Sequence, residues 1–379
     1  MAERTTRRQF LATCATAFCA ASTASLCCNP RSAMAQRPTR GLVKARLSPY
    51  FTPLGGGEVR CDLCPRRCRV AQGKRGLCRV RENRGGQYYS LVYGNPCALH
   101  LDPIEKKPFF HVLPGTTAYS VATAGCNFHC KFCQNWEISQ AAPEDLFNHD
   151  VPPDSLVQRA REVKARSVAY TYVEPTVFAE YMLDTARAAR AAGLLNVCHS
   201  NGFINPGPLE PLSQVLDAAN IDLKAFNDAF YRDYCQGELP PVLATLAALR
   251  RAGVHLEITN LVIPTLNDDL AHIRDMCLWV GRELGLETPM HFSRFYPLYK
   301  LKNLPPTPVT ILEQARAVAL AAGLEYVYIG NVPGHEGEHT FCPRCKRVLI
   351  ERSGFMIREV RLKQGKCGAC GKPIPGIWA

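Results

Sequence analysis

The cysteines of this sequence gather in closely spaced groups, and one group has the spacing of an iron–sulfur ligand set. Cys126, Cys130 and Cys133 form a C-x3-C-x2-C loop. A cubic 4Fe-4S cluster has four irons, so three thiolates would hold three of them and leave the fourth open to another ligand. The spacing therefore predicts a cluster with one reactive iron, and it makes these three cysteines the candidate catalytic residues.

A structural zinc site is the alternative use of the same loop. Zinc would need a fourth ligand nearby to close its tetrahedron. His129 is the only local candidate, and its neighbours in the loop already constrain it. We therefore favour iron–sulfur over zinc here.

A second group of four cysteines precedes this loop. Cys61, Cys64, Cys68 and Cys78 have C-x2-C-x3-C-x9-C spacing. Four thiolates are enough to close a tetrahedral zinc site or to ligate a second 4Fe-4S cluster completely. With no open position, such a site would be structural or would relay electrons. Disulfides are the alternative if the fold assembles outside the cytoplasm.

A third group lies near the end of the chain. Cys342 and Cys345 form one C-x2-C knuckle, and Cys367 and Cys370 form another. The pair resembles a zinc ribbon or, with iron, a rubredoxin-like site. We favour zinc with a folding or docking role. The remaining cysteines after residue 35 stand alone and are expected to be buried apolar side chains, namely Cys97, Cys198, Cys235 and Cys277.

The elements that must position the cysteine loop follow a regular alternation. Short apolar runs predict strands at residues 118–124, 167–172, 195–199, 219–223, 255–263, 290–295 and 326–329. Helical spacing predicts helices at residues 154–164, 177–192, 242–252, 270–284 and 310–322. The alternation indicates an α/β fold with a partial or complete TIM-type (β/α) barrel, whose chemistry lies at the carboxyl ends of the strands. An open doubly wound sheet is the alternative.

Several further stretches carry a resemblance to a known family. They are residues 102–108 (DPIEKKP), 133–140 (CQNWEISQ), 170–175 (YTYVEP) and 328–334 (YIGNVPG). The cysteine loop follows the first predicted strand and has Phe132 directly before its last cysteine. Together with this loop, the four stretches resemble radical S-adenosylmethionine enzymes of the AmmeMemoRadiSam system, which are relatives of pyruvate formate-lyase activating enzyme. The resemblance extends over nearly all of the chain after residue 35.

This resemblance implies an activity and partners. S-adenosylmethionine would chelate the open iron, and an electron from the reduced cluster would break its carbon–sulfur bond to give methionine and a 5'-deoxyadenosyl radical. The radical would abstract hydrogen from a protein or small molecule, as in a glycyl-radical activase. Partners would be an electron donor such as flavodoxin or ferredoxin, together with Memo-like and other AmmeMemo-system proteins. Neither the substrate nor the oligomeric state can be read from the sequence.

The resemblance also implies cofactor contacts, from Phe132 in the loop and from strand ends. Related enzymes use a Gly-Gly-Glu motif to hold the ammonium group. Here the glycines are replaced, but Glu174 can still accept that hydrogen bond. A solvated loop carboxylate is the alternative. Ser200 and Asn201 offer groups for a ribose or a carboxylate, although Asn-Gly at this point is equally a turn signal.

Two further candidates are weaker. Lys224, in Asp222-Leu223-Lys224, can bring a cation near the cofactor carboxylate, and a surface salt bridge is the alternative. His291 lies at the start of the sixth predicted strand, where a structural histidine is favoured and a cofactor contact is the alternative.

The first 35 residues resemble a twin-arginine export signal. Arg7 and Arg8 precede a weakly apolar stretch, and residues 33–35 (AMA) form an A-x-A cleavage site. The stretch is too rich in small residues to favour a stable membrane span, and a retained anchor is the alternative. We therefore expect export, although S-adenosylmethionine and low-potential electrons are cytoplasmic supplies, and a cytoplasmic location is the alternative.

These signals define five parts. They are a signal peptide (1–35), a linker (36–57), a cysteine-rich module (58–115), a barrel core (116–334) and a zinc-ribbon or rubredoxin-like module (335–379).

Charge bears on two other functions. The net charge is +12, and residues 60–84 alone hold nine lysines and arginines against two acidic residues. This run suggests an RNA-modifying radical enzyme, but it lacks aromatic residues for base stacking, so nucleic acid is not expected as a partner. A non-catalytic electron-transfer or metal-binding protein is the remaining alternative.

Overall fold

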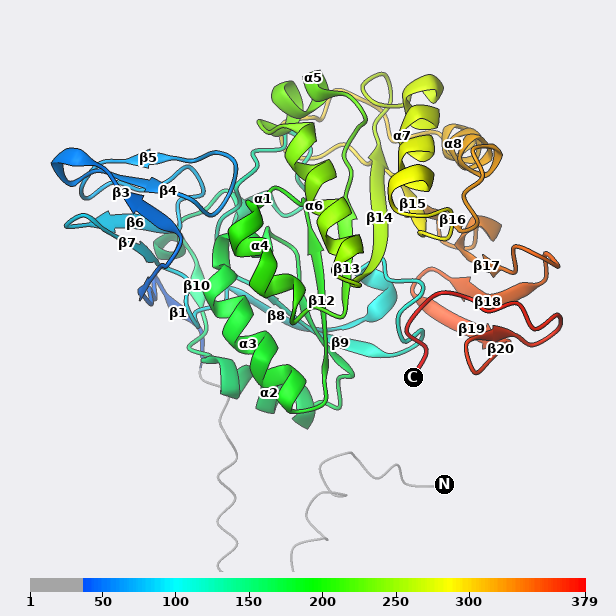
Figure 1. Cartoon of the computed structure of the whole chain (residues 1–379), viewed down its shortest axis with the longest axis horizontal. Helices are drawn as coiled ribbons and strands as arrows, with labels where there is room; N and C mark the ends of the chain where they lie inside the picture. The colour runs from blue at the N-terminus through cyan, green and yellow to red at the C-terminus, as the bar shows by residue number, and fades with distance from the viewer. Residues whose placement is uncertain (1–36) are drawn as a thin grey trace, which may run out of the picture. The chain divides into compact units, whose positions relative to one another are not determined.

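The computed structural model describes residues 37–379 (Figure 1). The expected signal peptide and its cleavage site lie outside the described residues. No helix within residues 37–379 combines the length and the apolar character that a membrane span requires.

An eight-stranded sheet forms the centre of the fold. Its members are β8 (Ala98–Pro103), β9 (Thr117–Ala122), β11 (Ser167–Tyr170), β12 (Leu195–Ser200), β13 (Ala218–Asp222), β14 (His255–Val262), β15 (Met290–Arg294) and β16 (Val327–Gly330). The strands from β9 to β16 run parallel and lie in chain order, while β8 pairs antiparallel with β9 at one edge. The order never reverses, so the sheet has no switch point of the doubly wound type. The prediction of an α/β partial barrel is confirmed.

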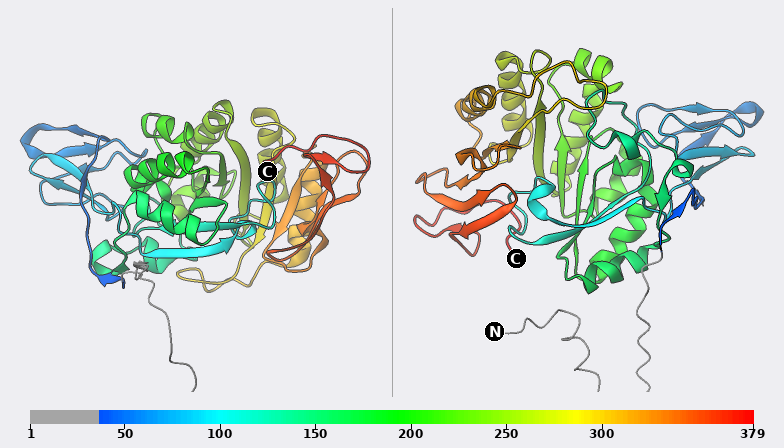
Figure 2. Two further views of the ribbon diagram at one scale, coloured as in Figure 1. Left: turned by 90° about the horizontal axis from the view of Figure 1, so that it is seen from below. Right: turned by 180° about the vertical axis from the view of Figure 1, so that it is seen from behind.

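The crossover connections carry helices that gather on one face of the sheet (Figures 1 and 2). They are α2 (Pro153–Glu162), α3 (Ala179–Ala191), α4 (Pro206–Ser213), α6 (Leu239–Arg251), α7 (Leu270–Glu283) and α8 (Val309–Ala321). The sequence predicted five of these and missed α4. Three prolines, at 206, 208 and 211, hide this helix in the sequence. Pro206 and Pro208 are nevertheless tolerated, because they lie in the first turn, where backbone N–H groups have no partner within the helix.

Small sheets form the amino-terminal part. One contains β3 (Phe51–Pro53), β4 (Val59–Cys61) and β5 (Arg69–Val70), and another contains β2 (Arg46–Leu47), β6 (Arg81–Arg84) and β7 (Gln87–Ser90). The segment 37–57, expected to be a linker, thus supplies β2 and β3, and also β1 (Thr39–Arg40), which pairs with β10 (Phe147–Asn148). The buried Arg81 guanidinium joins this part to α3 through two bonds to Glu180, 2.5 and 2.8 Å long.

The carboxyl-terminal part lies against the open side of the barrel. It contains β17 (Thr340–Phe341), β18 (Val348–Ser353), β19 (Met356–Val360), β20 (Leu362–Lys363) and β21 (Lys366–Cys367). The buried Arg352 donates to Phe110 O at 2.7 Å and to Thr340 Oγ1 at 2.8 Å, and Thr340 bonds to Tyr328 of β16. Leu113 N donates to Ile377 O at 2.7 Å. This part therefore connects β16 with the segment that leads into β9.

Candidate active site

A cavity of about 480 Å³ lies at the carboxyl ends of the parallel strands and extends inside the curve of the sheet. Its lining includes every residue that the sequence proposed for the cluster and the cofactor, namely Cys126, Cys130, Phe132, Cys133, Glu174, Ser200, Asn201, Lys224 and His291. All of them except His291 come from the carboxyl ends of β9, β11, β12 and β13 or the loops after these strands, and His291 lies near the amino end of β15.

The cysteine loop leaves β9 through a glycine that nothing else can replace. Gly125 has φ of +89°, and a Cβ there would lie 2.5 Å from Cys78 O. An L side chain is excluded both by this backbone conformation and by the contact. Beyond it, Asn127 Nδ2 donates to Phe203 O at 2.7 Å, and the buried Phe128 ring packs 5.0 Å from the Phe203 ring. The loop is thus fixed against the connection that follows β12.

The three sulfur atoms have different surroundings. Burial, and then the charge of Glu174, raises the pKa of Cys126, and burial raises that of Cys133. The pKa of Cys130 is lowered by a hydrogen bond from the Cys235 thiol. Cys133 Sγ also lies 3.2 Å from Ser139 Oγ. Hydrogen-bond donors around thiolate ligands are a principal means of tuning an iron–sulfur cluster.

The three sulfurs of this loop differ in arrangement from the cysteine quartet near the end of the chain. Within residues 37–379, the set of metal-ligating side chains found to converge within 4.8 Å of one another is the quartet near the end of the chain, and it includes neither this loop nor His129. His129 Nε2 is buried without a hydrogen-bond partner. The residues present suit a group that gives each thiolate its own metal atom, as a cubic cluster does.

Cys235 is a neighbour of the loop that the sequence did not reveal. It is fully buried at the end of a π-helix (Tyr231–Cys235), as an apolar side chain would be. Its thiol nevertheless contacts Cys130, and its carbonyl accepts a 2.9 Å bond from His129 N. A lone cysteine more than a hundred residues from the loop carries no local pattern, so this contact needed the fold.

Glu174, Ser200 and Asn201 form one hydrogen-bonded network. Glu174 Oε1 accepts from Ser200 Oγ at 2.7 Å and from both Thr176 N and Oγ1, while Oε2 accepts from Asn201 N at 2.7 Å. Burial raises the pKa of Glu174, and these donors oppose the rise. The solvated-carboxylate interpretation is wrong, because Glu174 is 3% exposed. Oε2 has one donor and can accept another.

Lys224 and Asp222 line the cavity as a partly buried ion pair. Lys224 Nζ lies 2.6 Å from Asp222 Oδ2, and His199 Nε2 lies 3.0 Å from the other oxygen. Burial alone would lower the pKa of Lys224, but the charge of Asp222 outweighs it, so the net shift is upward. The cation is 5.8 Å from the Phe132 ring centre. The salt bridge considered from the sequence is thus present, but it is partly buried and lines the cavity.

His291 is held by a residue that the sequence did not point out. Its Nε2 lies 2.7 Å from Oε2 of Glu257, a fully buried carboxylate in β14. Burial would raise the pKa of Glu257, but hydrogen bonds from His255 and His291 hold it well below its usual range. Backbone N–H groups of Phe110 and His111 complete its partners. His291 is thus a hydrogen-bonded buried histidine that also lines the cavity.

The stretch at residues 102–108 forms another wall. Asp102 accepts from Lys106 at 2.8 Å, from Lys107 at 2.6 Å and from the Tyr172 hydroxyl. The Lys107 ammonium is buried and lies 3.9 Å from the Tyr172 ring centre. Tyr172 itself has φ of +67° and sits two residues before Glu174. This ion-paired group therefore borders the proposed cofactor site.

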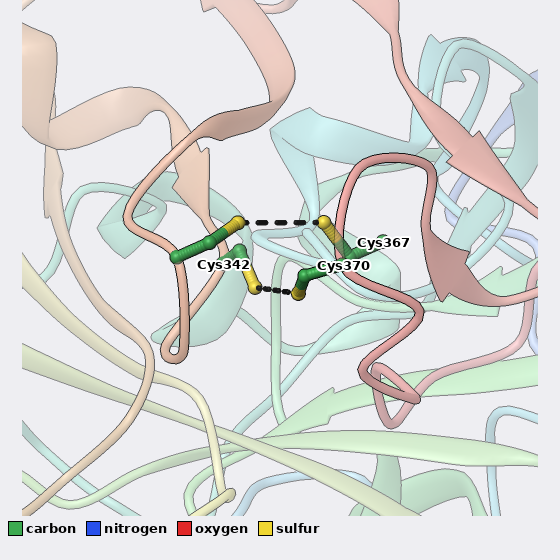
Figure 3. Close-up of side chains that lie close together, drawn as sticks. Cys342, Cys367 and Cys370 are labelled. Atoms are coloured by element: carbon green, nitrogen blue, oxygen red, sulfur yellow. Dashed lines mark hydrogen bonds between the residues drawn. The ribbon is translucent and has the colours of Figure 1, made fainter.

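The carboxyl-terminal quartet has the geometry of a single-ion site (Figure 3). The Cys342 and Cys370 sulfurs are 3.6 Å apart, and those of Cys345 and Cys367 are 3.7 Å apart. A Zn–S bond of about 2.3 Å in a tetrahedron separates its sulfurs by roughly 3.8 Å. Backbone N–H groups of Cys370 and Ala369 lower the pKa of Cys367 to about 6, which favours thiolate. This cluster can therefore bind a metal ion.

Several arginines of the basic segment 60–84 form ion pairs with acidic residues of the same chain. Arg75 bonds to Glu82 and Glu144, and Arg69 bonds to Glu58. Arg81 is buried against Glu180. These pairings lower the charge available to an external polyanion.

Comparison with known proteins agrees with this arrangement. Residues 120–277 match the family model described as the Radical SAM superfamily. An uncharacterized protein of Methanocaldococcus jannaschii is 46% identical over 327 residues, which cover 86% of this chain and 97% of that protein. The GTP 3',8-cyclase of Brucella ovis is 24% identical over 256 residues, covering 62% of this chain and 73% of the cyclase.

Solved structures were compared as well. A domain of pyruvate-formate lyase-activating enzyme from Bacteroides vulgatus superposes with a TM-score of 0.39 and 14% identity, over 44% of this chain and 99% of that domain.

Proposed function

Since this chain belongs to the radical SAM superfamily, we propose that it binds a 4Fe-4S cluster through Cys126, Cys130 and Cys133 and uses it to cleave S-adenosylmethionine reductively. The cluster and cofactor would supply a 5'-deoxyadenosyl radical, which abstracts hydrogen from a substrate. The observation that carries this proposal is the cavity, in which the three sulfurs and the strand-end polar groups face one space.

The chain's own residues would position the cofactor. Glu174 Oε2, with one donor already bound, has room to accept from the cofactor ammonium. Lys224 would face its carboxylate, held in place by Asp222 at 2.6 Å. Phe132 is buried beside Lys224 and would shield the reactive iron from water.

We propose a glycyl-radical-activase-like role within an AmmeMemo-type system, with a protein or small molecule as substrate. Its support is the set of stretches at 102–108, 133–140, 170–175 and 328–334. Flavodoxin or ferredoxin would supply electrons, and Memo-like proteins are the proposed partners. Co-purification of a tagged chain from cells, read by mass spectrometry, tests the partner set. If only proteins other than Memo-like and AmmeMemo-system proteins co-purify, the proposed AmmeMemo-type role is wrong.

We propose export by the twin-arginine route on the strength of residues 7–8 and 33–35. Fractionation of a tagged chain tests this, with Arg7→Lys/Arg8→Lys as the control variant. Export predicts tagged protein outside the cytoplasm that is lost in the variant. Equal retention of both in the cytoplasm would overturn it.

The catalytic proposal has a direct test. Protein reconstituted anaerobically with iron and sulfide, and reduced with dithionite, should convert S-adenosylmethionine to 5'-deoxyadenosine. Cys130→Ala should abolish this, because a lost ligand removes the cluster. Cys277→Ala is the matched control, since Cys277 is equally buried but lies in α7 and does not line the cavity. Full activity of Cys130→Ala would remove the assignment.

A further inference from the structure

The amino-terminal quartet differs from the carboxyl-terminal one in the spacing of its sulfurs. All four of its cysteines are free thiols, which removes the disulfide alternative in this structure. The β4–β5 hairpin sets Cys61 opposite Cys68, with Cys61 N donating to Cys68 O at 2.9 Å. Cys64 lies close to Cys61, Cys68 and Cys78, so the four side chains are neighbours.

The four sulfurs of this quartet are not found to converge as closely as those of the carboxyl-terminal quartet. Within residues 37–379 the convergence of ligand atoms within 4.8 Å is found at the other quartet and not at this one. A zinc ion would draw four sulfurs to roughly 3.8 Å from one another. A cubic cluster gives each thiolate a separate iron at a separate corner, which sets the sulfurs further apart. Neither this quartet nor the Cys126 loop is found among the ligand sets that converge within 4.8 Å in residues 37–379.

Two fully buried polar side chains lie beside the quartet. The Tyr88 hydroxyl interacts with the Cys61 thiol, and Nε of Arg81 has no hydrogen-bond partner. A Cβ at Gly76 would lie 2.7 Å from Tyr88 Oη and 3.8 Å from Cys68 Cβ. Because glycine has no Cβ, the Tyr88 hydroxyl can pack next to Gly76 and close to Cys68. The Arg81 guanidinium also lies near Cys61 and Cys78. Such groups suit a cluster with several negatively charged sulfurs.

The quartet also lies next to the catalytic loop. A Cβ at Gly125 would be 2.5 Å from Cys78 O, and Gly125 directly precedes Cys126. Standard backbone dimensions then place the Cys78 and Cys126 Cα atoms at most about 10 Å apart. Arg66, between Cys64 and Cys68, donates to Asn127 O inside the catalytic loop. Backbone segments of the two sites are therefore in direct contact.

We propose that Cys61, Cys64, Cys68 and Cys78 bind a second 4Fe-4S cluster that passes electrons to the cluster in the Cys126 loop. A low-potential one-electron carrier protein reduces the quartet cluster, which is reoxidised as the loop cluster is reduced. The electron then enters the carbon–sulfur bond of S-adenosylmethionine, and that bond breaks. The relay step rests on the proposed function, whereas the metal assignment does not.

The metal assignment is tested without any activity. The triple variant Cys126→Ser/Cys130→Ser/Cys133→Ser, reconstituted anaerobically, should retain about four irons per chain. On reduction it should give an electron paramagnetic resonance signal that S-adenosylmethionine does not change. A triple variant that binds zinc at the quartet, or no iron, would overturn the assignment. Because the quartet is intact in this variant, the result does not depend on the catalytic cluster.

The relay is tested by Cys68→Ser/Cys78→Ser, with Cys97→Ser as control. Formation of 5'-deoxyadenosine driven by reduced flavodoxin should fall at least about tenfold, while formation driven by dithionite should stay close to wild type. The loop cluster signal and its response to S-adenosylmethionine should also remain. Equal flavodoxin-driven rates in the variant and wild type would overturn the relay. A different outcome would overturn the proposed function alone. In that case the wild type would form no 5'-deoxyadenosine, while the triple variant would still bind about four irons.

Discussion

Glu174 Oε2 accepts a 2.7 Å hydrogen bond from Asn201 N, which joins the loop after β11 to the loop after β12. The same carboxylate takes three donors on its other oxygen. Both loops line the cavity beside the cysteine loop. The carboxylate is thus fixed in position and still has one acceptor site free.

Glu174→Gln should weaken cofactor binding, because an amide provides no negative charge for an ammonium group. A hydrogen bond to a charged group contributes about 1.5–3 kcal/mol, which corresponds to roughly a 10- to 100-fold rise in Kd. Calorimetric titration of the reconstituted protein with S-adenosylmethionine measures this. Glu162→Gln, on the exposed face of α2, is the control. Wild-type affinity in Glu174→Gln would exclude the contact.

Cys367→Ser should remove one zinc per chain and leave the iron content unchanged. The four sulfurs of that cluster converge within 4.8 Å, so the loss of one ligand opens the tetrahedron. Metal analysis of protein from zinc-supplemented cells gives both values. Unchanged zinc, or iron lost together with zinc, would contradict a separate single-ion site.

The buried His111 should make stability depend on acid pH. Its ring bonds to Pro375 O and to the Tyr328 hydroxyl, both at 2.6 Å, and burial lowers its pKa from 6.5 to about 3. The unfolded chain therefore binds a proton between pH 6.5 and 3 that the folded chain does not. Stability is fully present above pH 6.5 and falls as the pH drops, by on the order of 4 kcal/mol at pH 3.

Urea titrations at a series of pH values measure this effect. His111→Asn should lack this part of the pH dependence, whereas His272→Gln, at an exposed histidine, should keep it. Parallel pH profiles for wild type and His111→Asn would show that His111 is not the group responsible.

Cys235→Ala should retain the catalytic cluster, although its thiol touches Cys130. The hydrogen bond tunes Cys130 but does not replace a missing ligand, so iron content should be unchanged. A changed reduction potential in a spectroscopic titration is the expected effect. Loss of the cluster would show instead that Cys235 is a fourth ligand, and the iron would then have no free position for the cofactor.

The sequence predicted the barrel strands closely, because buried parallel strands appear as continuous apolar runs. It missed β8, an antiparallel edge strand that contains the polar His100 and Asp102. The cysteine groups were readable because their spacing is local. The contacts of Cys130 with Cys235 and of His291 with Glu257 were not, because each joins residues that are distant in sequence and leave no periodic signal.

The central claim is that the protein leaves one iron of the loop cluster unligated for S-adenosylmethionine. Electron paramagnetic resonance of the reduced Cys61→Ser/Cys64→Ser/Cys68→Ser/Cys78→Ser variant tests it most directly, because in this variant the loop cluster is observed alone. We expect addition of S-adenosylmethionine to shift the g values of that signal. A signal that stays the same at saturating cofactor would show that no iron is open to it, and would contradict the account.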